Sequence, residues 1–260
     1  TRKACNDIDA YDFLTKPFKT DVLIHAVGRA VEDLRLRNEN KILRARSAEQ
    51  RADLVGSSVV MSQMRSTLRK VAQSDSRVLI SGPPGSGKGG AAAVLHAKSP
   101  RSQGPFVPLS CSGLEPQDLE IELFGFEAND GGARRVGALE KAHRGTLLLD
   151  EVGDIPIETQ AKLVRVLHRP EFVRIGGNTL VNVDVRVIAS TVRDLKVSIS
   201  NGNFREDLFY RLNVVPLQMP PLCNRLDDLP ELADELMRRT AQSTHRPPRK
   251  FSPDALAALQ

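Results

Sequence analysis

The sequence contains no tryptophan, two tyrosines and three cysteines among its 260 residues. An odd number of widely spaced cysteines (Cys5, Cys111 and Cys223) predicts neither a disulfide framework nor a zinc site. No apolar run approaches the roughly 18 residues that a membrane helix needs, and the first residues show no signal-peptide pattern. These absences argue against a secreted, disulfide-bonded protein and against a membrane partner, so we expect a cytoplasmic location.

The remaining composition is that of an ordinary soluble protein, with 40% hydrophobic and 27% charged residues. A chain of 260 residues can bury one large core or two smaller ones. The formal net charge of +5 is compatible with an anionic partner such as a nucleotide or a nucleic acid. Because mildly basic proteins are common, the charge alone does not predict contact with nucleic acid.

Strand and helix signals alternate between residues 51 and 222, which is typical of an α/β domain. Three short apolar runs predict buried strands at residues 77–81, 145–151 and 183–191. Each run meets polar residues or glycines at its carboxyl end. In an open α/β sheet this edge is where ligands bind, so we expect the functional site there.

The first predicted strand leads into SGPPGSGKGG, residues 81–90, which has the pattern of a phosphate-binding loop. In such a loop, backbone N–H groups and a helix N-terminus surround the phosphates, and a lysine reaches the β- and γ-oxygens. Lys88 takes that lysine position, and Gly89 stands where the usual pattern has serine or threonine. We therefore expect the loop to bind ATP through Gly82, Pro83, Pro84, Gly85, Ser86, Gly87, Lys88 and Gly89.

Two adjacent acids, Asp150 and Glu151, end the second predicted strand. An acid at the end of a strand beside a phosphate-binding loop can hold the coordination shell of Mg²⁺, and a second acid can orient or deprotonate a water molecule. The alternative interpretation of this pair is a helix N-cap with surface charge. Taken with the glycine loop, the two acids predict a site for ATP and Mg²⁺.

A series of ordered motifs runs through residues 54–222: LVGSS, GPPGSGK, GPFVPLSC, ELFG, GTLLLDEVGDIP, QAKLVRVL, RIGG, DVRVIAST and FREDLFYRLNVVPL. This series resembles the AAA+ ATPase domain of the NtrC family, the bacterial enhancer-binding activators of sigma-54 RNA polymerase. The stretch VGALEKAHRGTLLLDE is most similar to the NtrX branch of that family. The resemblance implies an α/β AAA+ P-loop domain with a mainly parallel sheet flanked by helices, followed by an α-helical lid.

The resemblance also implies chemical roles at the ends of the predicted strands. Lys88 would bind the β- and γ-phosphates, and Asp150 would hold the Mg²⁺ ion. Glu151 would polarise the attacking water, and Thr191 would sense the γ-phosphate. The resemblance therefore implies an ATPase that would convert ATP and water to ADP and phosphate.

Further roles implied by the resemblance lie outside these strands. Val55 and Gly56 would contribute to the nucleotide site. Arg205 and Arg211 match arginines that reach into the site of the neighbouring subunit, which implies a ring-type homo-oligomer whose assembly controls hydrolysis. Without the resemblance, a surface salt bridge would be the simpler interpretation of each arginine.

Several residues differ from the sequence that the family usually has at these positions. Gly89 and Gly90 follow the loop lysine where the family usually has glutamate first, and each weakens the helix start by about 1 kcal/mol relative to alanine. Ser110 and Val192 both replace asparagines, and Cys223 replaces an arginine. Two functions therefore remain open: an ATPase that depends on oligomerisation, and a nucleotide-dependent assembly switch that does not hydrolyse ATP.

We expect four segments along the chain. Residues 1–20 resemble the end of a receiver domain, and residues 21–50 predict a linker helix. Residues 51–222 form the expected AAA+ core, and residues 223–260 the truncated start of the helical lid, with Ser252 as an N-cap before Pro253. The resemblance further implies a cognate sensor kinase acting through the receiver and DNA bound through a C-terminal domain beyond these residues.

The resemblance also brings out a missing motif. Family members that activate sigma-54 carry a GAFTGA loop in the interval that here has the sequence FEANDGGARRVGALEKA, residues 126–142. Asn129-Asp130-Gly131-Gly132 predicts a tight turn in place of the phenylalanine-threonine tip. A loop about four residues shorter loses up to roughly 13 Å of extended reach. The interval therefore argues against a contact with sigma-54.

Overall fold

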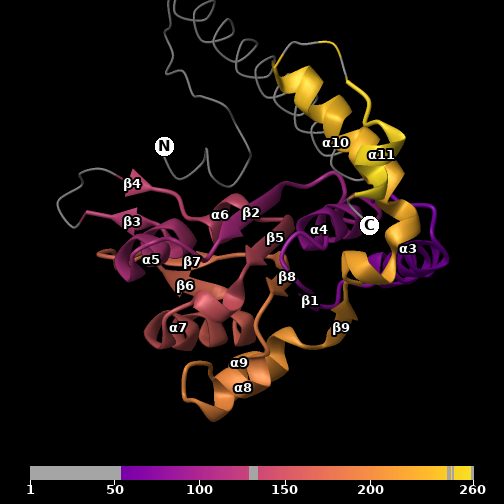
Figure 1. The fold of residues 1–260 in the computed structure, drawn as a ribbon. Helices are drawn as coiled ribbons and strands as arrows, with labels where there is room; N and C mark the ends of the chain where they lie inside the picture. The colour runs from indigo at the N-terminus through magenta and orange to yellow at the C-terminus, as the bar shows by residue number, and fades with distance from the viewer. Residues whose placement is uncertain (1–53, 129–133, 245–246, 248, 259–260) are drawn as a thin grey trace, which may run out of the picture. The chain divides into compact units, whose positions relative to one another are not determined.

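The computed structural model describes residues 54–128, 134–244, 247 and 249–258 (Figure 1). The expected receiver remnant at residues 1–20 and the expected linker helix at 21–50 lie outside the described residues, as does the turn predicted at residues 129–132.

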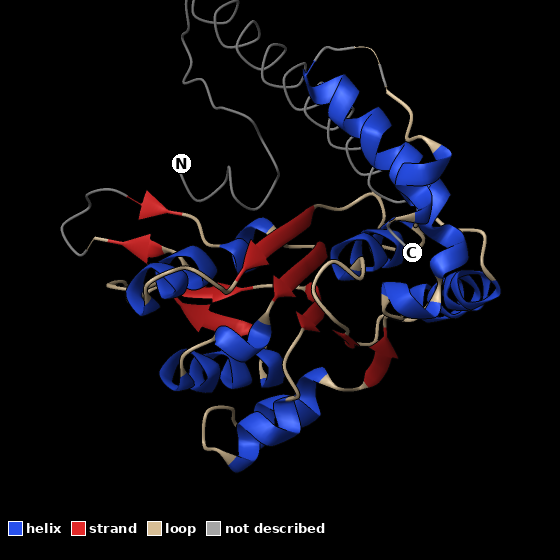
Figure 2. Cartoon of the chain, viewed as in Figure 1, coloured by secondary structure: helices blue, strands red, loops and turns tan. Residues whose placement is uncertain are grey.

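A five-stranded sheet forms the centre of the described chain, and all of its pairings are parallel (Figures 1 and 2). From one edge to the other the strands are β2 (Phe106–Ser110), β5 (Gly145–Asp150), β8 (Val185–Thr191), β1 (Val78–Ser81) and β9 (Val215–Gln218). The three strands predicted from the sequence are therefore confirmed and are the three central ones. Their carboxyl ends meet at one edge of the sheet.

Helices connect the strands and cover the sheet. Those of the α/β core are α3 (Val59–Ala72), α4 (Lys88–Ala97), α5 (Pro116–Phe124), α6 (Ala138–Lys141), α7 (Ile157–His168), α8 (Leu195–Ser200) and α9 (Glu206–Leu212). A single 3₁₀ turn, η1 (Val152–Asp154), follows β5.

Alternation along the strands divides the core into two apolar layers, one on each face of the sheet. On one face, strand residues such as Ile80 and Ile188 pack with the buried residues of α3 and α4. On the other face, Leu79, Leu149 and Ala189 pack with α5, α7 and α9. Burial on both faces explains why the strands have continuous apolar sequences rather than alternating ones.

Two short hairpins extend from the core: β3 (Phe126–Glu127) with β4 (Arg134–Arg135), and β6 (Glu171–Val173) with β7 (Leu180–Asn182). The two hairpins are joined, because the Glu127 N–H donates to the Ile175 carbonyl at 2.9 Å. Buried Arg174 binds Glu140 and Glu127 at 2.8 and 3.0 Å. The β3–β4 hairpin lies within the interval that lacks the GAFTGA sequence, and these contacts brace it against the β6–β7 hairpin.

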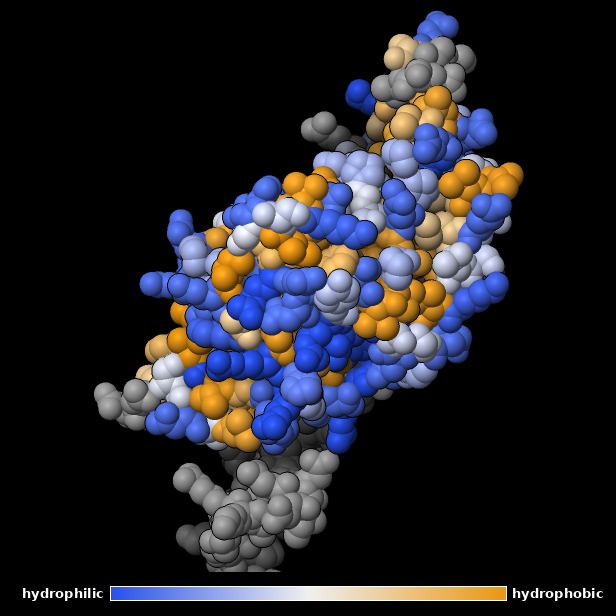
Figure 3. Space-filling model, turned by 90° about the horizontal axis from the view of Figure 1, so that it is seen from below, coloured by the Kyte–Doolittle hydropathy of each residue, from blue (hydrophilic) through white to orange (hydrophobic). Residues whose placement is uncertain are grey.

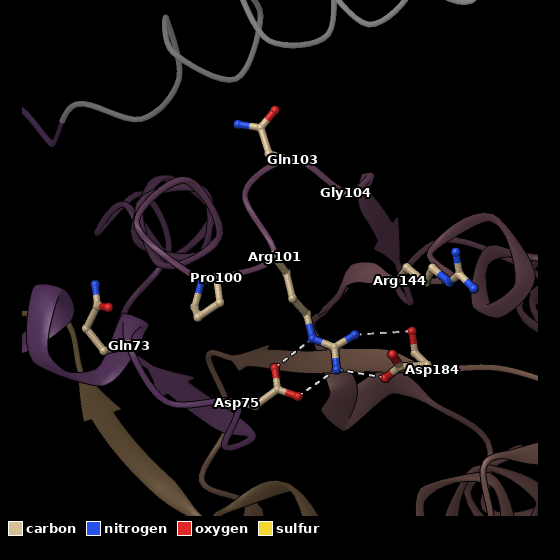
Figure 4. A pocket seen from close by; sticks show the side chains of 8 residues that line it. All are labelled: Gln73, Asp75, Pro100, Arg101, Gln103, Gly104, Arg144 and Asp184. Atoms are coloured by element: carbon tan, nitrogen blue, oxygen red, sulfur yellow. Dashed lines mark hydrogen bonds and ion pairs between the residues drawn. The ribbon is translucent and has the colours of Figure 1, made fainter.

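The amino edge of the sheet is held together by an ion cluster (Figure 4). Arg101 donates to both carboxylate oxygens of Asp75, at 2.7 and 2.6 Å, and to Asp184 at 2.7 Å. These bonds with Arg101 lower the pKa of Asp75. The cluster lines an open cavity of about 580 Å³ at the amino ends of the strands, the edge opposite the one that carries the glycine loop. Because Arg101 already satisfies both carboxylates, we interpret the cluster as a structural clamp.

The last part of the chain is helical, as expected for a lid. Two 3₁₀ turns, η2 (Leu222–Asn224) and η3 (Leu226–Asp228), lead into α10 (Leu229–Thr244) and then α11 (Pro253–Ala257). The Ser252 hydroxyl accepts a hydrogen bond from the Ala255 N–H at 3.2 Å, which confirms the predicted N-cap. Within the part of the chain that the structure describes, no helix is both long and apolar enough to span a membrane.

Candidate nucleotide site

The glycine loop joins β1 to α4 at the carboxyl edge of the sheet. Gly85 and Gly87 have φ angles of +73° and +98°, which favour glycine. The backbone N–H groups of residues 87–90 find no acceptor among the described residues. These donors at the start of a helix form the cradle that the phosphates of a nucleotide require.

Lys88 is 7% exposed and its Nζ lies among oxygen atoms. It donates to the carbonyls of Gly82 and Pro83 at 3.2 and 3.4 Å and lies 3.2 Å from Glu151 Oε1. The predicted loop lysine and the predicted catalytic acid are therefore brought together across two strands. Phosphate oxygens could replace the two carbonyls as acceptors for the Lys88 ammonium.

Glu151 directly follows β5 and has a left-handed backbone with φ 58° and ψ 57°. This conformation is uncommon for a residue other than glycine and turns the side chain away from the strand direction. Glu151 Oε2 accepts a hydrogen bond from the Val192 N–H at 2.8 Å, at the end of β8. Backbone from one neighbouring strand and the Lys88 ammonium together hold the carboxylate.

Asp150, the last residue of β5, fits a role in holding Mg²⁺. Its Oδ1 accepts from the Ser190 hydroxyl, whereas its Oδ2 has no hydrogen-bond donor among the described residues. Ser190 Oγ also accepts from the Glu151 N–H at 3.3 Å, so one buried hydroxyl orients both acids. The remaining carboxylate oxygen is a hard ligand of the kind that Mg²⁺ or its water shell prefers.

Ser110, which replaces an asparagine of the family, and Thr191, the expected sensor of the γ-phosphate, make hydrogen bonds with residues close to them in sequence. The Ser110 hydroxyl lies 3.2 Å from the Ser112 hydroxyl and makes no hydrogen bond with Glu151. Thr191 is buried, and its hydroxyl exchanges hydrogen bonds with the backbone of Arg193 at 3.1 Å. The Thr191 carbonyl accepts from the Gly82 N–H at 3.2 Å, which ties the end of β8 to the glycine loop.

Arg205 and Arg211 lie apart from the Lys88 cluster, at the start and near the end of α9. Arg205 is exposed and forms a bidentate pair with Asp207, at 3.0 and 2.8 Å. Arg211 has no ion-pair partner among the described residues. Its carbonyl accepts from Arg77 Nη1 at 3.2 Å. Within one chain, neither arginine bonds to the loop or to the two acids.

Val55 and Gly56 lie in the segment that enters α3, next to Leu54, whose side chain lies against the glycine loop. The carbonyls of Leu54 and Gly56 accept from Arg65 Nη1 at 3.2 and 2.6 Å. A Cβ atom added at Gly90 would lie 3.3 Å from Leu54 Cδ2, whereas one at Gly89 would meet nothing within 4 Å. The leucine thus covers the helix start on one side only, and the Gly89 position is open.

The sequence interpretation missed residues that act on the site through long-range contacts. Ser190 orients both acids from β8, and its position just before Thr191 was the available signal. Arg225 is 6% exposed and its Nη2 donates to the Ser86 carbonyl in the glycine loop at 2.8 Å. Nothing in the local sequence around residue 225 indicates that contact.

Three features define an AAA+ P-loop nucleotide-binding domain: a parallel sheet with β1 between β8 and β9, the glycine loop, and the two acids at the end of β5. Residues 54–218 match the family described as the Sigma-54 interaction domain. The chain belongs to this family, as the AAA+ domain of an NtrC-family enhancer-binding protein.

The most similar relatives include regulators of nitrogen assimilation. The chain is 48% identical over 251 residues to the nitrogen assimilation regulatory protein NtrX of Azorhizobium caulinodans, covering 96% of this chain and 55% of that protein. Crystal structures of NtrX from Brucella abortus with ADP and with ATP are 47% and 46% identical, with TM-scores of 0.77 and 0.76. Each alignment covers 99% of this chain and 58% of the other. The chain thus spans little more than half the length of these relatives.

Proposed function

We propose that this chain binds ATP with Mg²⁺ in the glycine loop and hydrolyses it as the motor domain of a two-component transcriptional regulator. The observation that carries the proposal is the 3.2 Å contact between Lys88 Nζ and Glu151 Oε1, with Asp150 beside it. The NtrX of Brucella abortus, a similar protein, has been crystallised with ADP and with ATP.

The chemistry of the proposed site follows from the positions of these side chains. Lys88 and the N–H groups of residues 87–90 would hold the phosphates, and Asp150 Oδ2 would hold the metal's water shell. Mg²⁺, when bound, would neutralise charge on the β- and γ-phosphates. Glu151 would leave Lys88 and orient a water molecule from its hydrogen bond to the Val192 N–H.

Substitution of the loop lysine tests nucleotide binding directly. Lys88→Ala removes the ammonium group from the cradle, so the affinity for a fluorescent ATP analogue should fall below detection. Lys98→Ala, which removes an exposed lysine just after the other end of α4, is the matched control and should bind as the wild type does. Equal affinity of the Lys88→Ala variant and the wild type would refute the assignment of the loop.

Hydrolysis is proposed to require a ring-type homo-oligomer. Arg205 and Arg211 make no hydrogen bond or ion pair with the glycine loop or the two acids of their own chain. An arginine supplied by a neighbour can raise the rate by about 10³–10⁵. The surface around α8 and α9 also exposes large side chains: Val197 is 55%, Tyr210 67% and Val214 53% exposed. Figure 3, a view from below Figure 1, shows apolar side chains interspersed among hydrophilic ones on that side.

A second function, an assembly switch that binds ATP without hydrolysing it, is favoured by one observation. Ser110 bonds with Ser112, and among the described residues the Glu151 carboxylate has no side-chain partner other than Lys88. Turnover measured for the wild type and for Glu151→Gln separates the two functions. If the chain is a motor, the wild type hydrolyses ATP and Glu151→Gln does not. If the chain is a switch, neither protein hydrolyses ATP.

We further propose that this regulator does not itself remodel sigma-54 polymerase, although its domain belongs to the Sigma-54 interaction family. Residues 126–142 lack the GAFTGA sequence. The full-length protein would be cytoplasmic, receive its signal from a sensor kinase and bind DNA through a C-terminal domain. ATP-dependent open-complex formation by the full-length protein at a sigma-54 promoter, with a GAFTGA-containing relative as the positive control, would overturn this proposal.

A further inference from the structure

A buried arginine at the base of the lid lacks a counter-ion. Arg225 is 6% exposed and lies between η2 and η3, and it forms no ion pair within the described residues. Its Nη1 lies 3.2 Å from the Met61 sulfur, a weak acceptor, and its Nε has no hydrogen-bond partner. A guanidinium is charged at any physiological pH, and a buried charge without a partner is costly.

The strongest contact of this arginine is with the glycine loop itself. Its Nη2 donates to the Ser86 carbonyl at 2.8 Å. A peptide group is planar and trans, so the Gly87 N–H points in the direction opposite to the Ser86 carbonyl. That N–H is one of the donors without an acceptor among the described residues. The arginine therefore fixes the direction of one donor in the cradle.

The same short segment of the lid base is anchored on the other side of the site. Asp228 is fully buried, three residues after Arg225, and accepts from the Ser58 N–H and hydroxyl at 2.7 and 2.8 Å. A Cβ atom at Gly56 would lie 2.5 Å from the Asp228 carboxylate carbon, so the segment fits closely against residue 56. The lid base thus contacts both the glycine loop and the segment that enters α3.

We propose that Arg225 is a positioning residue that aims the 86–87 peptide at the nucleotide phosphates and transmits the occupancy of the loop to α10. The inference rests on the proposed nucleotide binding. Arg225 has no acidic partner among the described residues. The phosphates of a bound nucleotide would place negative charge on the other side of the 86–87 peptide from its guanidinium. The buried Ser86 hydroxyl also has no hydrogen-bond partner among the described residues.

Substitutions at residue 225 test this role by the number of phosphates on the nucleotide. Arg225→Met keeps most of the apolar volume but removes the charge and the hydrogen bond, so the affinity for an ATP analogue should fall about 10- to 100-fold. The affinity for the matching adenosine analogue should change less than threefold. Arg225→Lys keeps a charge without the fork and should lie between the wild type and Arg225→Met.

The lid provides a second readout. Binding of ATP should increase the hydrogen-exchange protection of α10 in the wild type and leave it unchanged in Arg225→Met. Arg238→Met, at an exposed arginine paired with Glu235 on α10, is the matched control and should behave as the wild type in both measurements. Melting curves of each variant show whether it is folded.

Distinct results would overturn the inference. One is an unchanged ATP affinity in folded Arg225→Met or, if that variant does not fold, in Arg225→Lys. Another is an equal loss of affinity for ATP and adenosine, which would show a purely structural role. A wild type that binds no nucleotide would refute the proposed function and, with it, this inference.

Discussion

At the scale of single residues, two residues have a left-handed backbone conformation that residues other than glycine rarely adopt. Glu151 and Arg144 both have φ angles of 58°. At Glu151 the conformation turns a carboxylate toward Lys88, so the strain serves the site. Arg144 is exposed and directly precedes β5. Its backbone N–H donates to the Asp184 carbonyl, a hydrogen bond that does not depend on the side chain.

Relief of this strain gives a stability prediction. Arg144→Gly should raise the free energy of unfolding by about 0.5–1 kcal/mol, because the left-handed conformation costs other residues more than glycine loses in chain entropy. Arg144→Ala, which removes the same side chain but keeps the strain, is the control. Urea unfolding of both variants checks this, and a glycine variant no more stable than the alanine variant would contradict it.

A buried histidine gives the fold a dependence on pH. His96 in α4 stacks on Phe106 with ring centroids 5.2 Å apart, and its Nδ1 lies 2.9 Å from Thr146 Oγ1. Burial, and then the charge of Arg186, lower the pKa of His96 below 6.5, while a bond with the Gly104 backbone opposes this shift. The folded protein therefore takes up this proton at lower pH than the unfolded chain does.

The sign of the effect follows from this order. The contribution of His96 is complete above about pH 6.5 and is lost as the pH falls through the lower, folded pKa. His96→Asn, which can keep a bond to Thr146, should flatten the fall in melting temperature between pH 7.5 and 5.5. Equal slopes for wild type and variant would show that His96 does not control this range.

The identities of the site residues are easier to predict than their contacts. The sequence predicted Lys88, Asp150 and Glu151 as a group, because a loop and a strand end at one edge of a parallel sheet must meet. It did not predict that Ser190 and the Val192 N–H orient the acids, or that Arg225 reaches Ser86. Such contacts depend on the packing of elements far apart in the chain, which local patterns do not encode.

At the scale of elements, α4 begins with two glycines that differ in their surroundings. An added Cβ atom would meet nothing within 4 Å at Gly89 and would lie 3.3 Å from Leu54 Cδ2 at Gly90. At Gly89, no close packing requires a residue without a side chain, so nothing offsets the low helix propensity of glycine. At Gly90 the missing side chain gives room to the leucine that covers the loop.

This difference predicts that the same substitution has different effects at the two adjacent positions. Gly89→Ala should raise the free energy of unfolding by up to about 1 kcal/mol, since alanine favours the helix and enters open space. Gly90→Ala should gain less or lose stability, because it crowds Leu54. Thermal unfolding of the two variants checks this, and a greater gain at residue 90 than at residue 89 would contradict it.

Strand positions followed from the sequence with small errors at their ends. The predicted runs 77–81, 145–151 and 183–191 correspond to Val78–Ser81, Gly145–Asp150 and Val185–Thr191. Glu151 leaves its strand because its backbone turns left-handed, a feature with no sequence signature of its own. The two edge strands, β2 and β9, and the two hairpins were not predicted, because short or partly exposed strands carry weak periodicity.

At the scale of the whole molecule, the proposed hydrolysis needs a site that another copy of the chain completes. Arg205 is held by Asp207 and Arg211 lies on the same short helix, and neither bonds to the Lys88 cluster within one chain. Hydrolysis should therefore be slow in the dilute monomer and increase as subunits associate. The glycine loop and Lys88 belong to one chain, so we expect nucleotide binding not to depend on protein concentration.

The rate of ATP hydrolysis per subunit, measured over a range of protein concentrations that spans association, tests this claim most directly. The account predicts a specific activity that rises with concentration in the wild type and is lost in Glu151→Gln at every concentration. The variant should still bind ATP through Lys88. A specific activity that stays constant from dilute monomer to assembled protein, or that survives in Glu151→Gln, would contradict the account.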